Sequence, residues 1–394
     1  MRTYSAGRKL KYFLWLIDVV VDAYARLFYK RRKRGTPNTV APHFLLISFG
    51  HLGDALTFSY LFPIIKKQYP AATIDVLVGD WCEPMLAHNP YIRRMVYLNH
   101  FRNNRRPISF WAKLKAHWET TRQAIRQLRT QVYDYSIDIR YSDTVSHFIL
   151  PCIQVKKAIG FGDRGFGGLL DIEHFLPQGD FHHTTMYALL LHDASVRFNP
   201  VQLAPYFSVQ SSVSAVQHRL GLSAPTLPYV MICPEAGLET KMVPITFWAD
   251  WCKLLLQHTH FLLVFSGQRS YTIQLYEQVL KQHPDQHNRL FNAVSKLTLD
   301  EIAALSQQAH WAFTMDSLPA HLCSVFCSTV SFFYKSTSLQ FLPLAAKPSL
   351  VFHNQIDSQI YLQTTVVKTE AFEVESLFEI WANWIKNMPP STSN

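Results

Sequence analysis

The sequence is poor in cysteine, and the cysteines it has form no cluster. There are six among 394 residues, and none belongs to a C-x-x-C pair or is interleaved with histidines at a zinc-ligand spacing. Cys323 and Cys327 can share one helix face, but two thiols alone do not make a zinc site. We therefore expect reduced, mostly buried thiols of a cytosolic protein, with no metal site and no cofactor.

Most of the chain carries almost no net positive charge. The formal net charge is +10, but residues 1–35 hold ten Lys and Arg against two Asp. The other 359 residues therefore carry 28 basic against 26 acidic side chains, a net of +2. A nucleic-acid-binding face needs many phosphate contacts spread over the fold. This balance argues against a nucleic-acid partner and assigns the basicity to the N-terminal segment.

The chain also lacks an uninterrupted apolar run of the roughly 20 residues that a membrane-spanning helix needs. Its best candidate, residues 12–21, is broken by Asp18. On a helix, Lys11, Asp18, Asp22 and Arg26 would form one narrow polar stripe, and the rest of the surface would be apolar. The segment is therefore predicted to be a strongly amphipathic helix that does not cross a membrane.

Three interpretations of this helix stay open. A broad apolar face followed by the basic run "KRRKR" at 30–34 is typical of a helix that lies on an anionic membrane surface, here through residues 8–34. Alternatively, the apolar face packs on the body of the protein and the basic run is a solvated linker. A cleavable signal peptide is the third interpretation, because "AYA" at 23–25 resembles a cleavage site, but the two aspartates argue against it.

The length favours two domains, and from residue 43 short apolar runs alternate with helical stretches, as in parallel sheets covered by helices. The predicted strands are 43–49, 73–79 and 135–140 in the first half and 228–233, 261–267, 311–316, 328–333 and 348–353 in the second. The predicted helices are 54–70, 111–132, 247–258, 300–309 and 319–326.

A proline-rich stretch at 197–228 is predicted to contain the hinge between the halves. We expect a basic N-terminal extension (1–42), a first Rossmann-like domain (43–205) and a second (206–394). Two doubly wound α/β domains of this kind would face each other across a central cleft. Ligands are expected at the carboxyl ends of the strands.

The turn after the first predicted strand, "SFGHLGD" at 48–54, is the first candidate site. Gly50 and Gly53 permit a tight turn and close approach of a ligand, and the exposed amides around His51 can hold an anion. Asp54 then stands in the first turn of a helix. Its alternative role is simply to cap that helix.

Several segments, taken in order, resemble the heptosyltransferases of glycosyltransferase family 9. They are "SFGHLGDALTFSYLFPIIKKQYPAATIDVLVG", "YDYSIDIR", "KKAIGF", "TKMVPITFWADW", "LLVFSG" and "TMDSLPAHLCSVF". The resemblance extends from residue 43 to about 355 and implies the two-domain GT-B fold. It also implies inverting, metal-independent transfer of a heptose, usually from ADP-heptose, to a lipopolysaccharide core or similar lipid-linked anionic glycan. Such an enzyme would work as a peripheral protein on the cytoplasmic face of a bacterial inner membrane.

The resemblance also assigns roles to residues. Asp54 would be the general base, and the turn of Gly50, His51 and Gly53 would lie on the acceptor side. Lys241 would contact the donor phosphates and assist catalysis. Asp316, Ser317 and His321 would line the donor pocket.

Four positions depart from the family pattern. Val243 stands where a tryptophan precedes the proline, and Leu318 where a glycine follows D-S/T. Glu235 replaces the glycine of P-G-A, and Tyr334 lies where the family has an F-G-P-T turn. They keep two alternatives open: a diverged member with another nucleotide-sugar donor, or an inactive membrane-associated scaffold.

Overall fold

The computed structural model describes residues 2, 4, 8–31, 35–141, 145–179, 181–200, 203–222, 227–335, 339–354, 357, 359–361 and 363–387. Two compact units divide the chain, Met1–Leu203 and Ala204–Asn394. The division falls inside the proline-rich stretch at 197–228.

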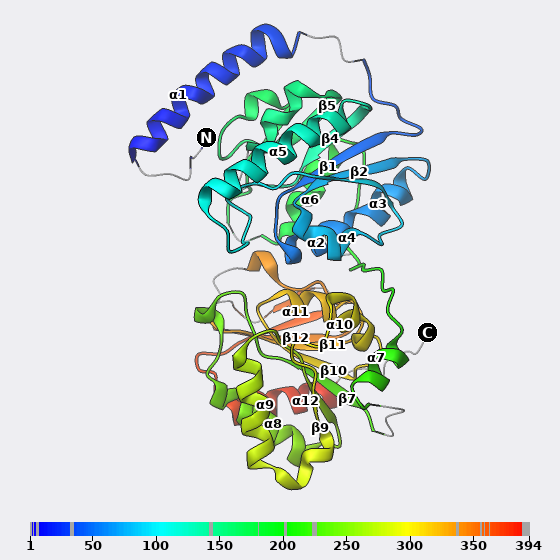
Figure 1. Ribbon diagram of the computed structural model, residues 1–394, viewed down its shortest axis with the longest axis vertical. Coiled ribbons are helices and arrows are strands. Elements are labelled where there is room, and N and C mark those ends of the chain that lie inside the picture. The colour runs from blue at the N-terminus through cyan, green and yellow to red at the C-terminus, as the bar shows by residue number, and fades with distance from the viewer. Residues whose placement is uncertain are drawn as a thin grey trace. The chain divides into compact units, whose positions relative to one another are not determined.

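The first unit is built on a parallel sheet of the order β3-β2-β1-β4-β5-β6 (Figure 1). Its strands are β1 (His43–Ser48), β2 (Thr73–Val78), β3 (Ile92–Tyr97), β4 (Val132–Asp138), β5 (Gln154–Phe161) and β6 (Ile172–His174). Every residue of β1 and β2 after the first is buried. Such continuous apolar runs are typical of parallel strands covered on both faces.

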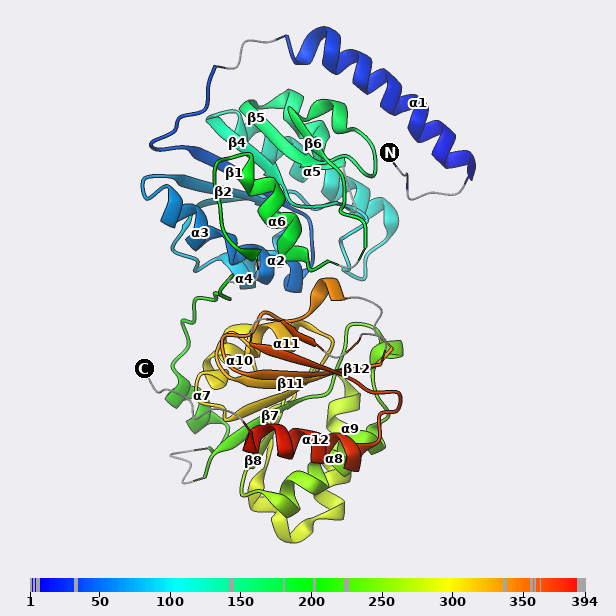
Figure 2. The same ribbon diagram turned by 180° about the vertical axis from the view of Figure 1, so that it is seen from behind.

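Helices cover both faces of this sheet. They are α2 (Leu52–Ser59), α3 (Leu61–Gln68), α4 (Glu83–Leu86), α5 (Phe110–Leu128) and α6 (His183–His192). α5 lies in front of the sheet in Figure 1 and α6 in front of it in Figure 2, so the two occupy opposite faces. The helix predicted over 54–70 is divided at Tyr60, because Pro63 lacks the N–H that would continue the ladder to Ser59.

The second unit repeats the plan of the first. Its strands are β7 (Tyr229–Cys233), β8 (Leu262–Phe265), β9 (Leu290–Asn292), β10 (Trp311–Met315), β11 (Ser328–Phe333), β12 (Ser349–His353), β13 (Gln359–Tyr361) and β14 (Thr364–Lys368). The stretch β9-β8-β7-β10-β11-β12 has the same parallel order as the first sheet, and β13 adds one antiparallel edge strand. Each sheet therefore has a topological switch point, between β1 and β4 and between β7 and β10.

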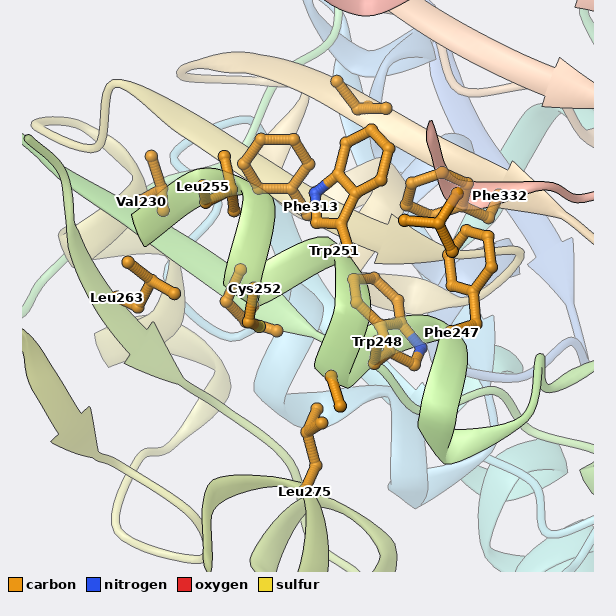
Figure 3. Close-up of a cluster of buried hydrophobic side chains, with 14 of the residues drawn as sticks. Val230, Phe247, Trp248, Trp251, Cys252, Leu255, Leu263, Leu275, Phe313 and Phe332 are labelled. Carbon is orange, nitrogen blue, oxygen red and sulfur yellow. The ribbon is translucent and has the colours of Figure 1, made fainter. Parts of the chain in front are cut away.

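An aromatic core holds the second sheet in place. The helices of this unit are α7 (Val213–Arg219), α8 (Ile245–His258), α9 (Ser270–Gln282), α10 (Leu299–Ser306), α11 (Leu318–Cys323) and α12 (Val374–Lys386). Phe247, Trp248 and Trp251 of α8 all contact Phe332 of β11, and Trp251 also contacts Phe313 of β10 (Figure 3). The Trp251 and Phe332 rings lie 5.0 Å apart edge to face, a favourable aromatic geometry.

The N-terminal helix α1 (Arg8–Tyr24) continues into a π-helical turn, η1 (Ala25–Tyr29). Asp18 and Asp22 of the polar stripe face the first unit, whereas Lys11 and Arg26 and most of the large apolar side chains are exposed. Val21, Ala25 and Tyr29 pack in the core of the first unit, so the interpretation in which the helix packs on the body holds for this part of its surface. Arg32, Lys33 and Arg34 of the basic run lie outside the described residues. Within the described part of the chain no helix is long and apolar enough to cross a membrane.

Candidate active site

Asp54 lies at the switch point of the first sheet, in the first turn of α2. Its Oδ2 atom accepts a hydrogen bond of 2.7 Å from the backbone N–H of His51. The same oxygen lies 3.3 Å from Nη1 of Arg140. The carboxylate thus caps the helix, as the alternative interpretation expects, and also faces a cation.

The two glycines of this turn have different roles. A Cβ atom at Gly50 would lie 2.3 Å from Cβ of Asp54, so any side chain there would displace the carboxylate. At Gly53 a Cβ atom would meet nothing within 4 Å. Gly50 is therefore needed for packing, whereas position 53 faces open space next to the candidate base.

Neighbouring loops fix the backbone of the turn. The Gly50 carbonyl accepts a hydrogen bond of 2.7 Å from Nε1 of Trp81, and the Phe49 carbonyl one of 2.9 Å from Asn103. The Cys82 thiol lies 3.5 Å from the Gly50 carbonyl, and burial raises the pKa of this thiol to about 12. The turn that carries Asp54 is thus held rigidly, as positioned catalytic groups must be.

Arg140 is a candidate functional residue that the motif does not predict. It follows β4, the strand that pairs with β1, so it emerges beside Asp54 at the same edge of the sheet. Burial, and then the charges of Arg105 and Arg140, lower the pKa of His51, which keeps its imidazole neutral near pH 7. Asp54 therefore lies among cations. The signal available in the sequence was an arginine at the carboxyl end of a predicted strand.

The corresponding edge of the second sheet brings Lys241 and Asp316 together. Lys241 belongs to a 3₁₀ turn after β7 (Glu239–Lys241), and Asp316 directly follows β10. Nζ of Lys241 lies 2.5 Å from Oδ2 of Asp316. His353, the last residue of β12, is fully buried, and burial lowers its pKa despite the nearby Asp316 charge. A cation that is partly exposed and held by a carboxylate is suited to binding a diphosphate.

The remaining donor-side candidates lie on or next to α11. Ser317 precedes this helix without capping it by its side chain, and its hydroxyl is 3.4 Å from the Met315 carbonyl. His321 is buried within the helix at 8% exposure. Among the described residues, no three His, Cys, Asp or Glu side chains are grouped to hold a metal ion.

Residues 121–371 match the family described as Glycosyltransferase family 9 (heptosyltransferase). The chain belongs to this family. The matched range contains Arg140, Lys241 and Asp316, and Asp54 lies before it.

Solved structures of the family share the fold of this family 9 chain. The glycosyl transferase family 9 protein from Veillonella parvula has a TM-score of 0.66 at 14% identity, covering 91% of this chain and 93% of that chain. ADP-heptose LPS heptosyltransferase II from E. coli has a TM-score of 0.64 at 18% identity, covering 87% and 99%. The predicted GT-B fold class, with two Rossmann-like domains, is confirmed.

A short segment also matches curated relatives. Lipooligosaccharide heptosyltransferase 2 from Haemophilus ducreyi is 36% identical over 52 residues. The enzyme of the same name from Haemophilus influenzae matches to the same extent. This match spans 13% of the family 9 chain and 15% of each relative.

The departures from the family 9 pattern have structural consequences. The Glu235 carboxylate accepts hydrogen bonds from the backbone N–H groups of Gln268 and Arg269, at 2.9 and 2.8 Å, and from the Thr272 hydroxyl. Glu235 thereby caps the N-terminus of α9, although it lies more than 30 residues earlier in the sequence. An internal carboxylate thus occupies a helix end that would otherwise attract an anion.

The other departures alter packing. Val243 is buried in the core cluster of α8. Tyr334 packs edge to face on Phe372 at 5.4 Å, and the following Lys335 has a φ of +52°. Leu318 opens α11 in a half-buried position. Lys335 therefore adopts the left-handed conformation that usually selects glycine, where the family has F-G-P-T.

Proposed function

We propose that this protein is an inverting, metal-independent glycosyltransferase that moves a heptose from ADP-heptose to a lipopolysaccharide core or similar lipid-linked glycan. The observation that carries the proposal is that each sheet has reactive groups at its switch point. These are Asp54 in the first unit and the Lys241–Asp316 pair in the second. Membership of family 9 supports the same reaction.

Asp54 would act as the general base. In an inverting transfer, the acceptor hydroxyl oxygen bonds to the anomeric carbon as the bond to the diphosphate breaks on the opposite face. The hydroxyl proton passes to a base within about 3 Å. Asp54 Oδ2 is engaged by His51 and Arg140, so Oδ1 would take the proton.

Lys241 would stabilise the leaving diphosphate. Its ammonium group supplies a fixed positive charge where negative charge develops in the transition state. Asp316 holds Lys241 in position, and Ser317 and His321 would complete the donor pocket. The E. coli heptosyltransferase WaaC has been solved with ADP and with ADP-2-deoxy-2-fluoro heptose, which supports an ADP-sugar as the donor.

The acceptor would be an anionic, lipid-linked glycan at the cytoplasmic face of a bacterial inner membrane. Arg140 next to the base and Arg105 nearby provide cations that would attract phosphate or carboxylate groups of the acceptor sugar. The net charge of +8 in residues 1–35 agrees with an anionic surface.

The decisive experiment compares Asp54→Asn with the wild type in a transfer assay with ADP-heptose and a heptose-free lipopolysaccharide core, in the presence of EDTA. Loss of the base should lower kcat by about 10²- to 10⁴-fold, while ADP binding by calorimetry should be unchanged. Asp300→Asn is the matched control, because Asp300 also lies in the first turn of a helix and accepts backbone N–H bonds.

Wild-type turnover in the Asp54→Asn variant would refute the assignment of the base and favour the inactive scaffold or another residue. Turnover that EDTA abolishes and Mg²⁺ restores would refute the metal-independent mechanism.

A further inference from the structure

The N-terminal helix α1 faces the protein with its charged side. Asp18 is only 2% exposed, and its Oδ1 atom accepts a hydrogen bond of 2.7 Å from the backbone N–H of Phe166. Nη1 of Arg2 contacts Asp18 at 2.9 Å and Asp22 at 2.8 Å, while its Nε contacts Glu173 at 2.8 Å. These ion pairs and hydrogen bonds fix the rotation of the helix about its axis.

The surface that receives the helix is shaped for it. A Cβ atom at Gly168 would lie 2.0 Å from Oδ1 of Asp22. A Cβ atom at Gly165, where φ is +103°, would lie 2.6 Å from the ring of Tyr4. The Tyr4 hydroxyl donates to Asp18. The glycine-rich turn of 162–168 thus allows close approach of the helix, so the fold itself requires Asp18 and Asp22 to point inward.

The opposite side of the helix is apolar and exposed. Eight large side chains of α1 and η1 are between 45% and 65% exposed: Tyr12, Phe13, Trp15, Leu16, Val19, Val20, Leu27 and Phe28. They recur at the three- and four-residue spacing of one helix face. Figures 1 and 2 both show α1 at the periphery of its unit. Contiguous exposed apolar surface of this kind marks an interaction site.

The charges around this face identify its partner. Lys11, Arg26, Lys30 and Arg31 are exposed, and the acidic side chains of α1, Asp18 and Asp22, are turned inward and paired. Among the described residues, the exposed apolar face is thus bordered by basic side chains, two of which, Arg26 and Lys30, also line a small cavity against the first unit. Aromatic and aliphatic residues flanked by Lys and Arg are characteristic of helices at the interface of an anionic bilayer.

We propose that α1 and η1 form a membrane-docking helix that lies flat in the headgroup region of an anionic bilayer. Asp18 and Asp22 would hold the first unit on the side of this helix that faces away from the bilayer. The apolar face enters the acyl boundary, and Lys30 and Arg31 contact lipid phosphates. Asp18 interrupts the apolar run of the helix, and within the described residues no helix is long and apolar enough to cross a membrane. This inference goes beyond the proposed transfer reaction and does not depend on it.

The test measures binding of the full-length protein to vesicles of phosphatidylethanolamine and phosphatidylglycerol by co-sedimentation. The variant Phe13→Ser/Leu16→Ser/Val20→Ser should bind about ten-fold or more weakly, because it removes apolar surface that enters the bilayer. The matched control, Val40→Ser/Val132→Ser/Ile273→Ser, changes side chains of similar exposure elsewhere and should bind as the wild type does. Equal melting temperatures of the two variants verify the fold.

A second pair of variants tests the charge. Lys30→Glu/Arg31→Glu should weaken binding to these vesicles and leave the weaker binding to phosphatidylcholine vesicles unchanged, because only the anionic surface attracts the basic residues. Lys253→Glu/Lys281→Glu, exposed on the second unit, should have no effect. Asp54→Asn should bind vesicles as strongly as the wild type does. Vesicle binding therefore tests the membrane-docking helix separately from the catalytic role of Asp54.

Three results would overturn the proposal. The first is that the wild type binds neither kind of vesicle. The second is that the apolar variant and its matched control lose binding equally. The third is that, in sedimentation velocity without lipid, the wild type is a dimer and the apolar variant a monomer. The last result would assign the face to a second copy of this chain.

Discussion

At the scale of single residues, Arg140 and Asp54 form the contact that most affects the proposed chemistry. The guanidinium is 20% exposed and lies 3.3 Å from the carboxylate, so it can orient the base and still reach a bound ligand. Its position after β4, the neighbour of β1, explains how residues 86 positions apart meet. A carboxylate oriented in this way is ready to accept a proton without rearrangement.

Arg140→Gln should therefore impair acceptor binding more than the chemical step. Loss of a charge-assisted contact costs about 1.5–3 kcal/mol, so the KM for an anionic acceptor should rise about ten-fold or more while kcat falls less. Arg140→Lys should restore part of the loss. The measurement is steady-state kinetics with varied acceptor, and Arg126→Gln, exposed on α5, is the control. An unchanged KM with reduced kcat would instead mean that Arg140 acts only by orienting Asp54.

Some of the candidate site residues can be predicted from motifs in the sequence, whereas others depend on the order of strands in the sheets. Asp54 and Lys241 were predicted because short local patterns surround them. The pairing of Lys241 with Asp316 depends on β7 lying next to β10, and no local pattern specifies that order. Arg140 was missed for the same reason, since its significance comes from the neighbouring strand.

At the scale of elements, two strands that the sequence analysis did not predict, β3 and β5, carry basic side chains. β3 contains Arg93 and Arg94, and both contact Asp75, which is fully buried on β2. β5 contains Lys156, which contacts Asp134 on β4. Buried partners on the next strand make these positions compatible with a sheet, so apolar runs alone could not reveal β3 and β5. The largely buried strands β1, β2, β4, β7, β8, β10, β11 and β12 were predicted, whereas the edge strands β6, β9 and β13 and their neighbour β14 were not.

The Asp75 cluster predicts how acid affects stability. Burial opposes ionisation, but hydrogen bonds from His43, Arg93 and Tyr133 outweigh it and hold the pKa of Asp75 well below its ordinary value. A lowered folded-state pKa gives stability that is present above the unfolded value of about 3.9 and is lost as pH falls through the folded value. The free energy of unfolding should therefore decline below about pH 4.

Asp75→Asn should flatten this decline and cost about 3 kcal/mol at pH 7, because it removes the buried counter-charge of the partly exposed Arg93 and Arg94 and disturbs the hydrogen bond of buried Tyr133. Urea unfolding of the full chain between pH 7 and pH 3 would measure both effects. Asp357→Asn removes an exposed ion pair with Lys368 and should leave the curve unchanged. An identical acid dependence in Asp75→Asn and the wild type would contradict this account.

At the scale of the whole molecule, the chain consists of two units with the same strand order and separate cores. The first presents a carboxylate among cations at its switch point, and the second a lysine–carboxylate pair. The excess charge lies in neither sheet but in the first 35 residues. The three tasks proposed above, contact with the membrane, proton transfer and donor binding, are therefore assigned to successive parts of the sequence.

This separation predicts where a nucleotide binds. ADP should protect the backbone amides after β7 and β10 and around α11 from hydrogen exchange, because the proposed donor contacts, Lys241 and Asp316 to His321, lie there. Saturation at about 100 times Kd would stabilise the second unit by about 2.7 kcal/mol. Lys241→Ala should lose most of this protection, whereas Lys253→Ala, exposed on α8, should keep it.

UDP is the informative comparison for the diverged-donor alternative. If Glu235 at α9 and Leu318 at α11 have changed the donor, UDP should protect these segments better than ADP does. If neither nucleotide protects them, the donor site has been lost, and the scaffold interpretation replaces the enzyme. Protection by ADP confined to the first unit would contradict the assignment of Lys241, because a cation that neutralises a diphosphate must lie within a few ångströms of it.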